Sequence, residues 1–298
     1  MHSYALSLAC VGSYVTAELA EALRKSSWTA IEVSSGDVLF DETPEGLASV
    51  RRTRELIKEG VLKTASLHMP FGYPRWRCFD PSALDEDMRR TCIRNMTKLV
   101  RENADLIGQH ITIHASGEPP QEEHPQYMAQ FCRSMEELLP LAEEYNFSFN
   151  VEFLPRTCIG NCVEELQYIM DKFPTPHLGI CFDVNHIMNR HKELPAMIDT
   201  LAPRIRSFHI SDYDGVDERH WMPGQGIIDW PAVMKSIRKI DHDVLLIFET
   251  CYQLANPYAS RPPVDPLFSL RQNEKACWYM ENCDQLNLAF ADFKVPTA

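Results

Sequence analysis

Short runs rich in β-branched and aromatic residues alternate along the chain with longer segments of helical periodicity. Several of these runs, such as Val244-Leu-Leu-Ile-Phe248, are apolar almost throughout. Strands that are apolar on both faces are typical of a parallel sheet covered by helices on either side. The pattern predicts strands at Tyr4–Cys10, Thr29–Ser35, Thr64–Met69, His110–Ser116, Ser148–Leu154, Leu178–Val184, Ile205–Ser211 and Val244–Thr250.

Between the predicted strands, apolar residues recur every three or four positions, which is the spacing of one buried helix face. Strict alternation of strands and helices requires parallel pairing, because each crossover needs a helix. Eight such units predict an α/β fold of the closed (βα)8 TIM-barrel type. The helices are predicted at Ala17–Lys25, Pro44–Glu59, Leu84–Leu106, Tyr127–Tyr145, Val163–Phe173, Leu194–Leu201, Pro231–Ile240 and Pro266–Asp284.

A doubly wound open sheet is the alternative arrangement of the same elements. No G-x-G-x-x-G follows the first predicted strand and the chain has no G-x-x-x-x-G-K-[ST], which weakens that alternative. No Pro-, Gly- or Ser-rich linker divides the chain. We therefore predict a single domain over residues 1–298, with residues 251–298 as a C-terminal helical extension.

Acidic and imidazole side chains lie at the ends of four consecutive predicted strands. Glu152 lies at the end of the fifth strand, Asp183 of the sixth, His209 of the seventh and Glu249 of the eighth. An ionised carboxylate inside an apolar strand is costly unless it is paired or binds a metal. In a barrel these four positions converge on the C-terminal mouth, where the active sites of this fold lie.

Three carboxylates and one imidazole form an oxygen-rich ligand set with a single nitrogen. Such a set suits Mn²⁺, Mg²⁺ or Co²⁺ and tolerates Zn²⁺. We therefore predict one divalent metal ion held by Glu152, Asp183, His209 and Glu249. The alternative to a metal site is that each carboxylate is paired with its own Arg or Lys. That alternative would have to be true of all these strand-end residues at once.

Four further histidines, His68, His114, His186 and His220, lie at strand ends or in the loops that follow them. A lone histidine is often a hydrogen-bonded core residue. Beside a metal cluster these four are predicted to line the pocket, as hydrogen-bonding partners of the substrate or as further metal ligands.

Charge and cysteine content restrict the partners and the compartment. The 29 Lys and Arg residues against 42 Asp and Glu residues give a formal net charge of −13 with His neutral. Binding many phosphates requires a basic face, so this charge argues against nucleic acid as a partner. No apolar run reaches the roughly 18 residues of a membrane span, so none is predicted. The 10 cysteines include no C-x-x-C pair, which indicates a reducing, cytoplasmic environment.

The candidate residues are carried by short motifs whose order along the chain resembles that of the xylose isomerase-like TIM-barrel superfamily. The resemblance covers about Leu6 to Thr250. This superfamily holds sugar and sugar-phosphate isomerases and epimerases, inosose dehydratases and isomerases, and endonuclease IV-type DNA repair enzymes. The motifs are Leu67-His-Met-Pro, Ile113-His, Val151-Glu-Phe, Phe182-Asp-Val-Asn-His, Phe208-His-Ile-Ser-Asp, Arg219-His-Trp-Met-Pro-Gly-Gln-Gly and Phe248-Glu-Thr.

Within the superfamily the chain resembles the ketose 3-epimerase branch. The resemblance implies a metal-dependent isomerase or epimerase that acts on a sugar, sugar phosphate or related keto-polyol through a metal-stabilised enediolate. It implies that Glu152 and Glu249 act as catalytic acid and base on opposite faces of the substrate, and that His186 and Arg219 hold substrate oxygens. A small-molecule carbohydrate substrate and a homodimer or homotetramer follow from the same resemblance. Cys158 stands where family epimerases often carry a second Glu.

Three other functions stay open at this point. An inosose dehydratase-type lyase would use the same metal and bases. An endonuclease IV-like, zinc-dependent AP endonuclease would use three zinc ions, although Glu218-Arg-His220 stands here in place of that branch's Asp-x-His. A metal-binding barrel without catalysis is the third. The endonuclease resemblance implies as ligands His68, His114, Glu152, Asp183, His186, His209, Glu218 or Asp217, His220 and Glu249.

Overall fold

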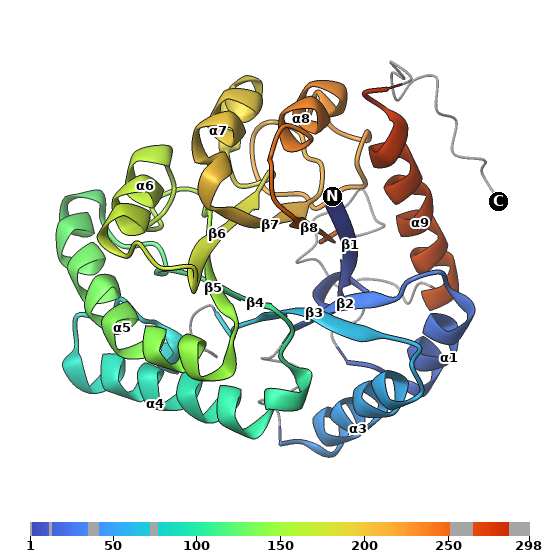
Figure 1. Cartoon of the computed structure of the whole chain (residues 1–298), viewed down its shortest axis with the longest axis horizontal. Coiled ribbons are helices and arrows are strands. Elements are labelled where there is room, and N and C mark those ends of the chain that lie inside the picture. Colours follow the sequence, from blue (N-terminus) through green and yellow to red (C-terminus); the bar gives the residue numbers. More distant parts are fainter. Residues whose placement is uncertain (1, 12–13, 35–41, 72–76, 251–264, 286–298) are drawn as a thin grey trace.

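A closed barrel of eight parallel strands, surrounded by helices, forms the molecule (Figure 1). The computed structural model describes residues 2–11, 14–34, 42–71, 77–250 and 265–285. Each strand pairs with the next one along the chain, and β1 pairs with β8 to close the barrel. The predicted (βα)8 TIM barrel is thus confirmed. The strands are β1 (His2–Ser7), β2 (Ala30–Ser34), β3 (Lys63–His68), β4 (His110–Ile113), β5 (Ser148–Glu152), β6 (Leu178–Asp183), β7 (Ile205–Ile210) and β8 (Val244–Phe248).

A helix follows each strand, as the alternating pattern predicts. Several helices begin at a side chain that accepts a hydrogen bond from the first turn, including Thr16 before α1, Asp85 before α4 and Asp229 before α8. The helices are α1 (Ala17–Lys25), α3 (Pro44–Lys58), α4 (Glu86–Glu102), α5 (His124–Tyr145), α6 (Val163–Lys172), α7 (Leu194–Leu201), α8 (Trp230–Ile237) and α9 (Pro266–Asn282). No helix in these described ranges is both long enough and apolar enough to span a membrane.

The last described helix, α9, lies in the ring between α8 and α1 (Figure 1). The indole Nε1 of Trp28 donates a hydrogen bond to the carbonyl oxygen of Leu270 at 3.3 Å, which ties α9 to the start of β2. Residues 266–282 therefore take the place of the eighth barrel helix. The rest of the predicted extension, residues 251–264 and 286–298, lies outside the described residues, and the domain boundaries stay a prediction.

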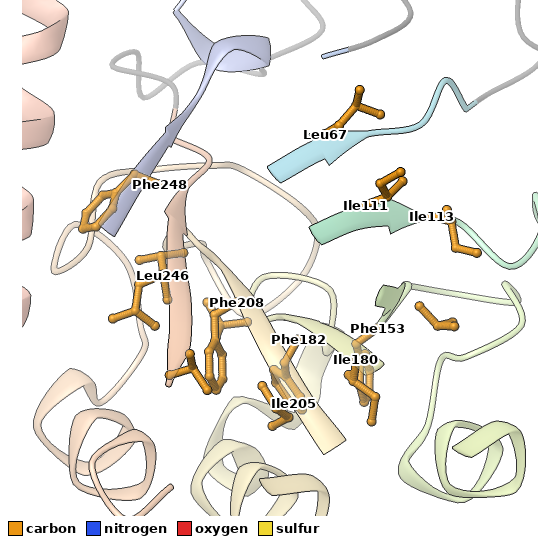
Figure 2. Close-up of a cluster of buried hydrophobic side chains, with 14 of the residues drawn as sticks. Leu67, Ile111, Ile113, Phe153, Ile180, Phe182, Ile205, Phe208, Leu246 and Phe248 are labelled. Carbon is orange, nitrogen blue, oxygen red and sulfur yellow. The ribbon is translucent and has the colours of Figure 1, made fainter. Parts of the chain in front are cut away.

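The hydrophobic core lies between the strands and the helices. Side chains at alternate strand positions, among them Leu67, Ile111, Phe182, Phe208 and Phe248, point outward from the barrel and are fully buried under the helices (Figure 2). Because strand side chains alternate between two faces, the intervening residues point into the barrel.

The barrel interior holds both apolar and polar side chains. A small apolar cluster joins Ala5, Ala30, Leu245 and Ile247 of β1, β2 and β8. Beside it, interior residues form hydrogen bonds between strands, such as the bond from Asn150 Nδ2 to Ser207 Oγ at 3.1 Å. The candidate site lies at the mouth of the barrel, at the C-terminal ends of the strands.

Several strands end earlier than predicted. The strand predicted to reach Cys10 ends at Ser7 and continues as a short 3-10 turn, and the strand predicted to reach Ser116 ends at Ile113. The residues just after the strands, such as Phe153 and Val184, remain fully buried in the loops at the mouth. Hydrophobicity therefore continues past the last strand residue, and the sequence pattern does not mark the end of the strand.

Candidate metal centre

The four strand-end residues predicted to bind metal meet at one point. Glu152 ends β5, Asp183 ends β6, His209 lies one residue before the end of β7, and Glu249 directly follows β8. One ligand atom from each lies within 4.8 Å of the others. We call these four residues the central group. The barrel register sets them at the same height, since Asp183 pairs with His209 across β6 and β7.

His209 lies at the middle of the central group. Its Nδ1 is 3.0 Å from Glu152 Oε1, 3.1 Å from Glu249 Oε2 and 3.7 Å from Asp183 Oδ2. One ring nitrogen cannot form a linear hydrogen bond to three carboxylates at once. Carboxylates gathered this closely repel one another unless a cation lies between them. The geometry therefore suits a bound cation better than a network of hydrogen bonds.

Asp183 supports the same conclusion. Its Oδ1 accepts a hydrogen bond from the backbone N–H of Asn185 at 2.6 Å, which fixes the carboxylate plane. Its Oδ2 is buried and has no hydrogen-bond partner among the described residues. A buried carboxylate oxygen without a partner is costly. Because this oxygen points at the central group, the donor set fits a divalent metal ion, which prefers carboxylate and imidazole ligands.

Charge within the central group is shared between acids and imidazoles. Burial alone would raise the pKa of Glu152, but the neighbouring His209 and His114 reverse that effect and hold it well below the usual value. In the same way His209 overcomes the effect of burial on Glu249 and lowers its pKa to about 2. Both carboxyl groups are thus ionised at neutral pH, which is the form that binds metal and accepts protons.

A second set, His68, His114 and Glu152, adjoins the central group through the shared Glu152. We call it the β3–β4 group, after the strands that carry the histidines. Glu152 Oε2 lies 3.2 Å from His68 Nε2 and 2.8 Å from His114 Nε2. The ring of Phe71 stacks on His114 with a centroid distance of 4.0 Å, while 48% of Phe71 remains exposed. An exposed aromatic ring thus covers one side of the acidic mouth.

A third set, His186, Glu218 and His220, also brings its ligand atoms within 4.8 Å of one another. We call it the loop group, because Glu218 and His220 lie on the loop between β7 and α8. His186 Nε2 is 3.4 Å from Glu218 Oε2, and the guanidinium of Arg156 binds Glu218 Oε1. Burial would raise the pKa of Glu218, but His186 and then Arg156 hold it well below its usual value.

The β7–α8 loop is held in place by the buried carboxylate of Asp212. It accepts hydrogen bonds from the backbone N–H of Gly224 at 2.8 Å and from the indole Nε1 of Trp230 at 2.8 Å. Gly226 is required here, since a Cβ would lie 2.2 Å from the carbonyl oxygen of Tyr213. The loop also places His220 in the left-handed region with φ of 51°. A non-glycine residue persists there only when its surroundings fix it, which is common at functional sites.

Most of the predicted substrate-contacting residues lie at this mouth. His68 and His114 lie beside Glu152, and His186 and His220 belong to the loop group. Arg219 has a different neighbour: its Nε donates to Asp214 Oδ2 at 2.8 Å, within the same loop. A substrate that used Arg219 would have to share or displace that ion pair.

Two residues at the site were not singled out from the sequence. Glu32, in the middle of β2, is fully buried beside His209, and Phe71 stacks on His114. Glu32 carries the same signal as Glu152, an acid inside an apolar strand, so the pattern could have found it. Cys158, which stands where relatives often carry an acid, is buried, and burial raises the pKa of its thiol to about 12. It is therefore neutral at neutral pH and no substitute for a carboxylate.

The barrel and its acidic and imidazole mouth define a (βα)8 protein with groups that could hold a metal ion at the C-terminal ends of the strands. Residues 20–266 match the sequence profile of the xylose isomerase-like TIM-barrel family. The chain belongs to that family.

The relatives of similar sequence include an uncharacterized protein and two proteins with different enzyme names. An uncharacterized protein of Methanocaldococcus jannaschii is 22% identical over 191 residues, covering 61% of this chain and 63% of that protein, so the chain spans less than two thirds of its length. Fructoselysine 3-epimerase of Escherichia coli O157:H7 is 23% identical over 56% of this chain and 60% of its own. Probable endonuclease 4 of Mycoplasmopsis pulmonis is 24% identical over 45% of this chain and 52% of its own.

Solved structures agree on the fold. A D-tagatose 3-epimerase-like protein superposes with a TM-score of 0.74 and 18% identity, covering 96% of this chain and 100% of that protein. D-psicose 3-epimerase from Clostridium cellulolyticum H10, solved with D-tagatose, gives a TM-score of 0.73 and 14% identity over 95% of this chain and 99% of its own. At these identities the likeness establishes a shared barrel and leaves the reaction to the site.

Proposed function

We propose that this protein is a divalent-metal-dependent isomerase or epimerase that acts on a sugar, sugar phosphate or related keto-polyol. The observation that carries the proposal is the central group. Two ionised carboxylates, Glu152 and Glu249, reach the same point from β5 and β8, and Asp183 offers an oxygen with no hydrogen-bond partner among the described residues. The named epimerases among the relatives support the same reading.

Glu152, Asp183, His209 and Glu249 would hold one divalent ion, for which Mn²⁺, Mg²⁺, Co²⁺ and Zn²⁺ are the candidates. When bound, the ion would polarise a substrate carbonyl and the neighbouring hydroxyl and so acidify the C–H between them. The protein supplies the remaining parts of the chemistry, which are proton transfer and substrate orientation.

Proton transfer is assigned to the two glutamates. Glu152 and Glu249 come from strands on different sides of the barrel mouth, so a substrate carbon between them has a carboxylate on each face. One carboxylate can remove a proton from one face, and the carbon then takes up a proton on the opposite face, which the other carboxylate relays from solvent. The outcome is inversion at that carbon. Transfer by a single carboxylate between neighbouring carbons would give isomerisation instead.

Substrate orientation is assigned to the surrounding histidines and Phe71. His68, His114, His186 and His220 would hydrogen-bond hydroxyl groups, and Arg219 would do so once released from Asp214. The exposed face of Phe71 would pack on the apolar C–H face of a sugar, as aromatic rings do at sites that combine apolar and polar contacts. A cytoplasmic location and a homodimer or homotetramer belong to the same proposal, and the cysteines that the structure describes are free thiols.

Solvent isotope exchange tests the proposal directly. Metal-loaded protein in D₂O, offered ketoses, sugar phosphates and inososes, is expected to incorporate deuterium at the carbon next to the carbonyl. Chelator-treated protein and the Glu249→Gln variant are expected to show none. A dehydratase would be recognised by loss of water from the product. Absence of exchange with all these substrates in the metal-loaded protein would refute the proposal.

A second function is favoured by one specific observation. The β3–β4 group and the loop group flank the central group, so the mouth offers ligands for up to three ions, as an endonuclease IV-like AP endonuclease would require. The net charge of −13 argues against it, because a DNA groove needs a basic face. The guanidinium of Arg156 is also engaged by Glu118, Asp217 and Glu218.

Metal content and an oligonucleotide assay separate the two functions. The nuclease predicts three zinc ions per chain by elemental analysis and cleavage of a duplex that contains an abasic site. The epimerase predicts one tightly bound ion and no cleavage. Three ions together with cleavage would replace the primary proposal.

A further inference from the structure

Three of the histidines at the mouth have one ring nitrogen anchored on the main chain. His68, His186 and His220 place Nδ1 at 2.8, 3.0 and 3.1 Å from a backbone carbonyl oxygen. A carbonyl only accepts hydrogen bonds, so this nitrogen carries a proton and Nε2 faces the ligand groups. In these three residues the main chain fixes the orientation of the ring.

His209 is anchored differently. It presents Nδ1 to the central group, and its Nε2 lies 3.3 Å from Oε1 and 3.4 Å from Oε2 of Glu32. A side-chain carboxylate therefore takes the place that a backbone carbonyl has for the other three histidines. Both residues are fully buried, so no solvent competes for this contact.

Glu32 is itself held by two hydroxyl groups inside the barrel. Ser66 Oγ donates to its Oε2 at 2.8 Å, and Thr112 Oγ1 donates to the same oxygen at 3.3 Å. Its Oε1 accepts no hydrogen bond from the described residues. The basic group paired with this oxygen is the imidazole of His209, whose Nε2 lies 3.3 Å away. A buried carboxylate without Lys or Arg costs stability, so its position suggests a role beyond packing.

We propose that Glu32 is a positioning residue of the metal centre, which accepts the Nε2 proton of His209 and so presents Nδ1 to the cation. The inference rests on the proposed metal-dependent function. A carboxylate behind a ligating histidine fixes the ring tautomer and orientation and makes the other nitrogen a better donor to the metal. Glu32 acts only through His209.

Cobalt binding by the full-length protein tests the role of Glu32. Stripped wild-type protein and the Glu32→Gln variant are titrated with Co²⁺ and followed by the visible absorption of the bound ion. The amide keeps the size of the side chain and removes its charge. The expected result is a weakening of Co²⁺ affinity by about 10- to 100-fold. In Zn²⁺-loaded protein labelled with ¹⁵N, we also expect the His209 Nε2–H resonance to change in the variant.

Glu165→Gln is the matched control. Glu165 also pairs with a histidine, since its Oε1 lies 2.9 Å from Nδ1 of His124, but neither residue belongs to a ligand group. This variant is expected to keep wild-type Co²⁺ affinity. Equal weakening in both variants would show a general loss of stability and would overturn the inference.

The outcomes separate the two levels of the argument. If wild-type protein binds Co²⁺ and Glu32→Gln binds it equally well with an unchanged His209 resonance, the inference on Glu32 is wrong while the proposed function stands. If wild-type protein binds no divalent ion, both fall. Should Glu32→Gln fail to fold, Ser66→Ala decides the matter. Weaker Co²⁺ binding would then support the inference, and wild-type affinity would overturn it.

Discussion

The central group and the loop group lie at the same mouth but are built on different supports. The residues of the central group lie at or next to the ends of β5, β6, β7 and β8, so the hydrogen bonds of the barrel fix their positions. The loop group takes Glu218 and His220 from a loop that depends on the contacts of Asp212. One set is thus positioned by the fold itself and the other by a local arrangement of side chains.

The two groups also differ in charge. The carboxylates of the central group face imidazoles, which can lose a proton to solvent when a metal ion binds. Glu218 in the loop group faces the guanidinium of Arg156, which stays charged at any accessible pH. A fixed positive charge beside a ligand competes with a cation. We therefore expect the central group to bind a divalent ion first and more tightly than the loop group.

Substitution of a central-group acid is expected to have the largest effect. Glu152→Gln removes a ligand and a catalytic group together, so epimerisation or exchange activity should fall by about 10²- to 10⁴-fold. Glu218→Gln is the matched control in the loop group and should lose less activity and keep the tight ion. Equal losses, measured as kcat/KM, would remove the distinction between the groups.

Metal removal is expected to lower thermal stability. An ion at about 100 times its dissociation constant stabilises the folded chain by about 2.7 kcal/mol. For a chain of this size that corresponds to a Tm higher by roughly 4 °C. Calorimetry with and without Mn²⁺ measures the shift. It should persist in Glu218→Gln and vanish in Asp183→Asn. A shift of equal size in all three proteins would contradict the account.

The stability of metal-free protein should depend on pH in a defined direction. Burial would lower the pKa of His186 and His68, but neighbouring carboxylates raise it to about 10 for His186 and about 8 for His68. Both groups therefore stabilise the folded chain below their ordinary value of 6.5, and this contribution is lost as pH rises through 8 and then 10.

The carboxylates set the acid limit of that dependence. Since the pKa of Glu249 is lowered to about 2, its stabilisation is present above its ordinary value of 4.5 and is lost as pH falls towards 2. The summed contribution of these three groups to the stability of metal-free protein should thus be largest between about pH 4.5 and 6.5. Chemical denaturation at several pH values checks this, and stability that increases between pH 7 and 9 would contradict it.

Removal of the positive charge beside Glu218 tests whether that charge weakens metal binding by the loop group. Arg156→Gln removes the guanidinium from Glu218, so a second, weaker divalent ion should bind about tenfold more tightly, which is the effect of about 1.4 kcal/mol. Arg133→Gln is the control. It also removes an exposed arginine that pairs with a glutamate, Glu86, but neither residue belongs to a ligand group. Unchanged affinity for the second ion would show that Arg156 does not limit the loop group.

The smallest effect is expected at Phe71. Because 48% of its surface is exposed, Phe71→Ala should leave the free energy of unfolding nearly unchanged. Loss of the ring's contact with a sugar, about 0.5–1.5 kcal/mol, should raise KM by several-fold with little change in kcat. A fall in kcat with constant KM would instead place the ring in the catalytic step.

Much of the fold and the central group follows from the sequence for one physical reason. In a parallel barrel the C-terminal ends of the strands lie at one rim. A carboxylate at the end of an apolar run therefore indicates both that a strand ends there and that the residue lies at the mouth. Glu152 and Asp183 are found in this way, and their convergence agrees with the prediction. Their role as metal ligands is our proposal.

The remaining features depend on loops, whose conformation no periodicity reports. The contact between Arg156 and Glu218 joins two loops that are 62 residues apart in the chain. The ion pair of Arg219 with Asp214 depends on a turn within the β7–α8 loop. Neither contact follows from hydrophobic spacing, because side-chain partners across loops are set by the folded main chain.

Equilibrium binding of Mn²⁺ to chelator-stripped protein, measured by electron paramagnetic resonance, tests the central claim most directly. The account predicts one tight site per chain in the wild type and in Glu218→Gln, and loss of that site in Asp183→Asn. Tight binding that survives in Asp183→Asn, or no tight site in the wild type, would contradict it.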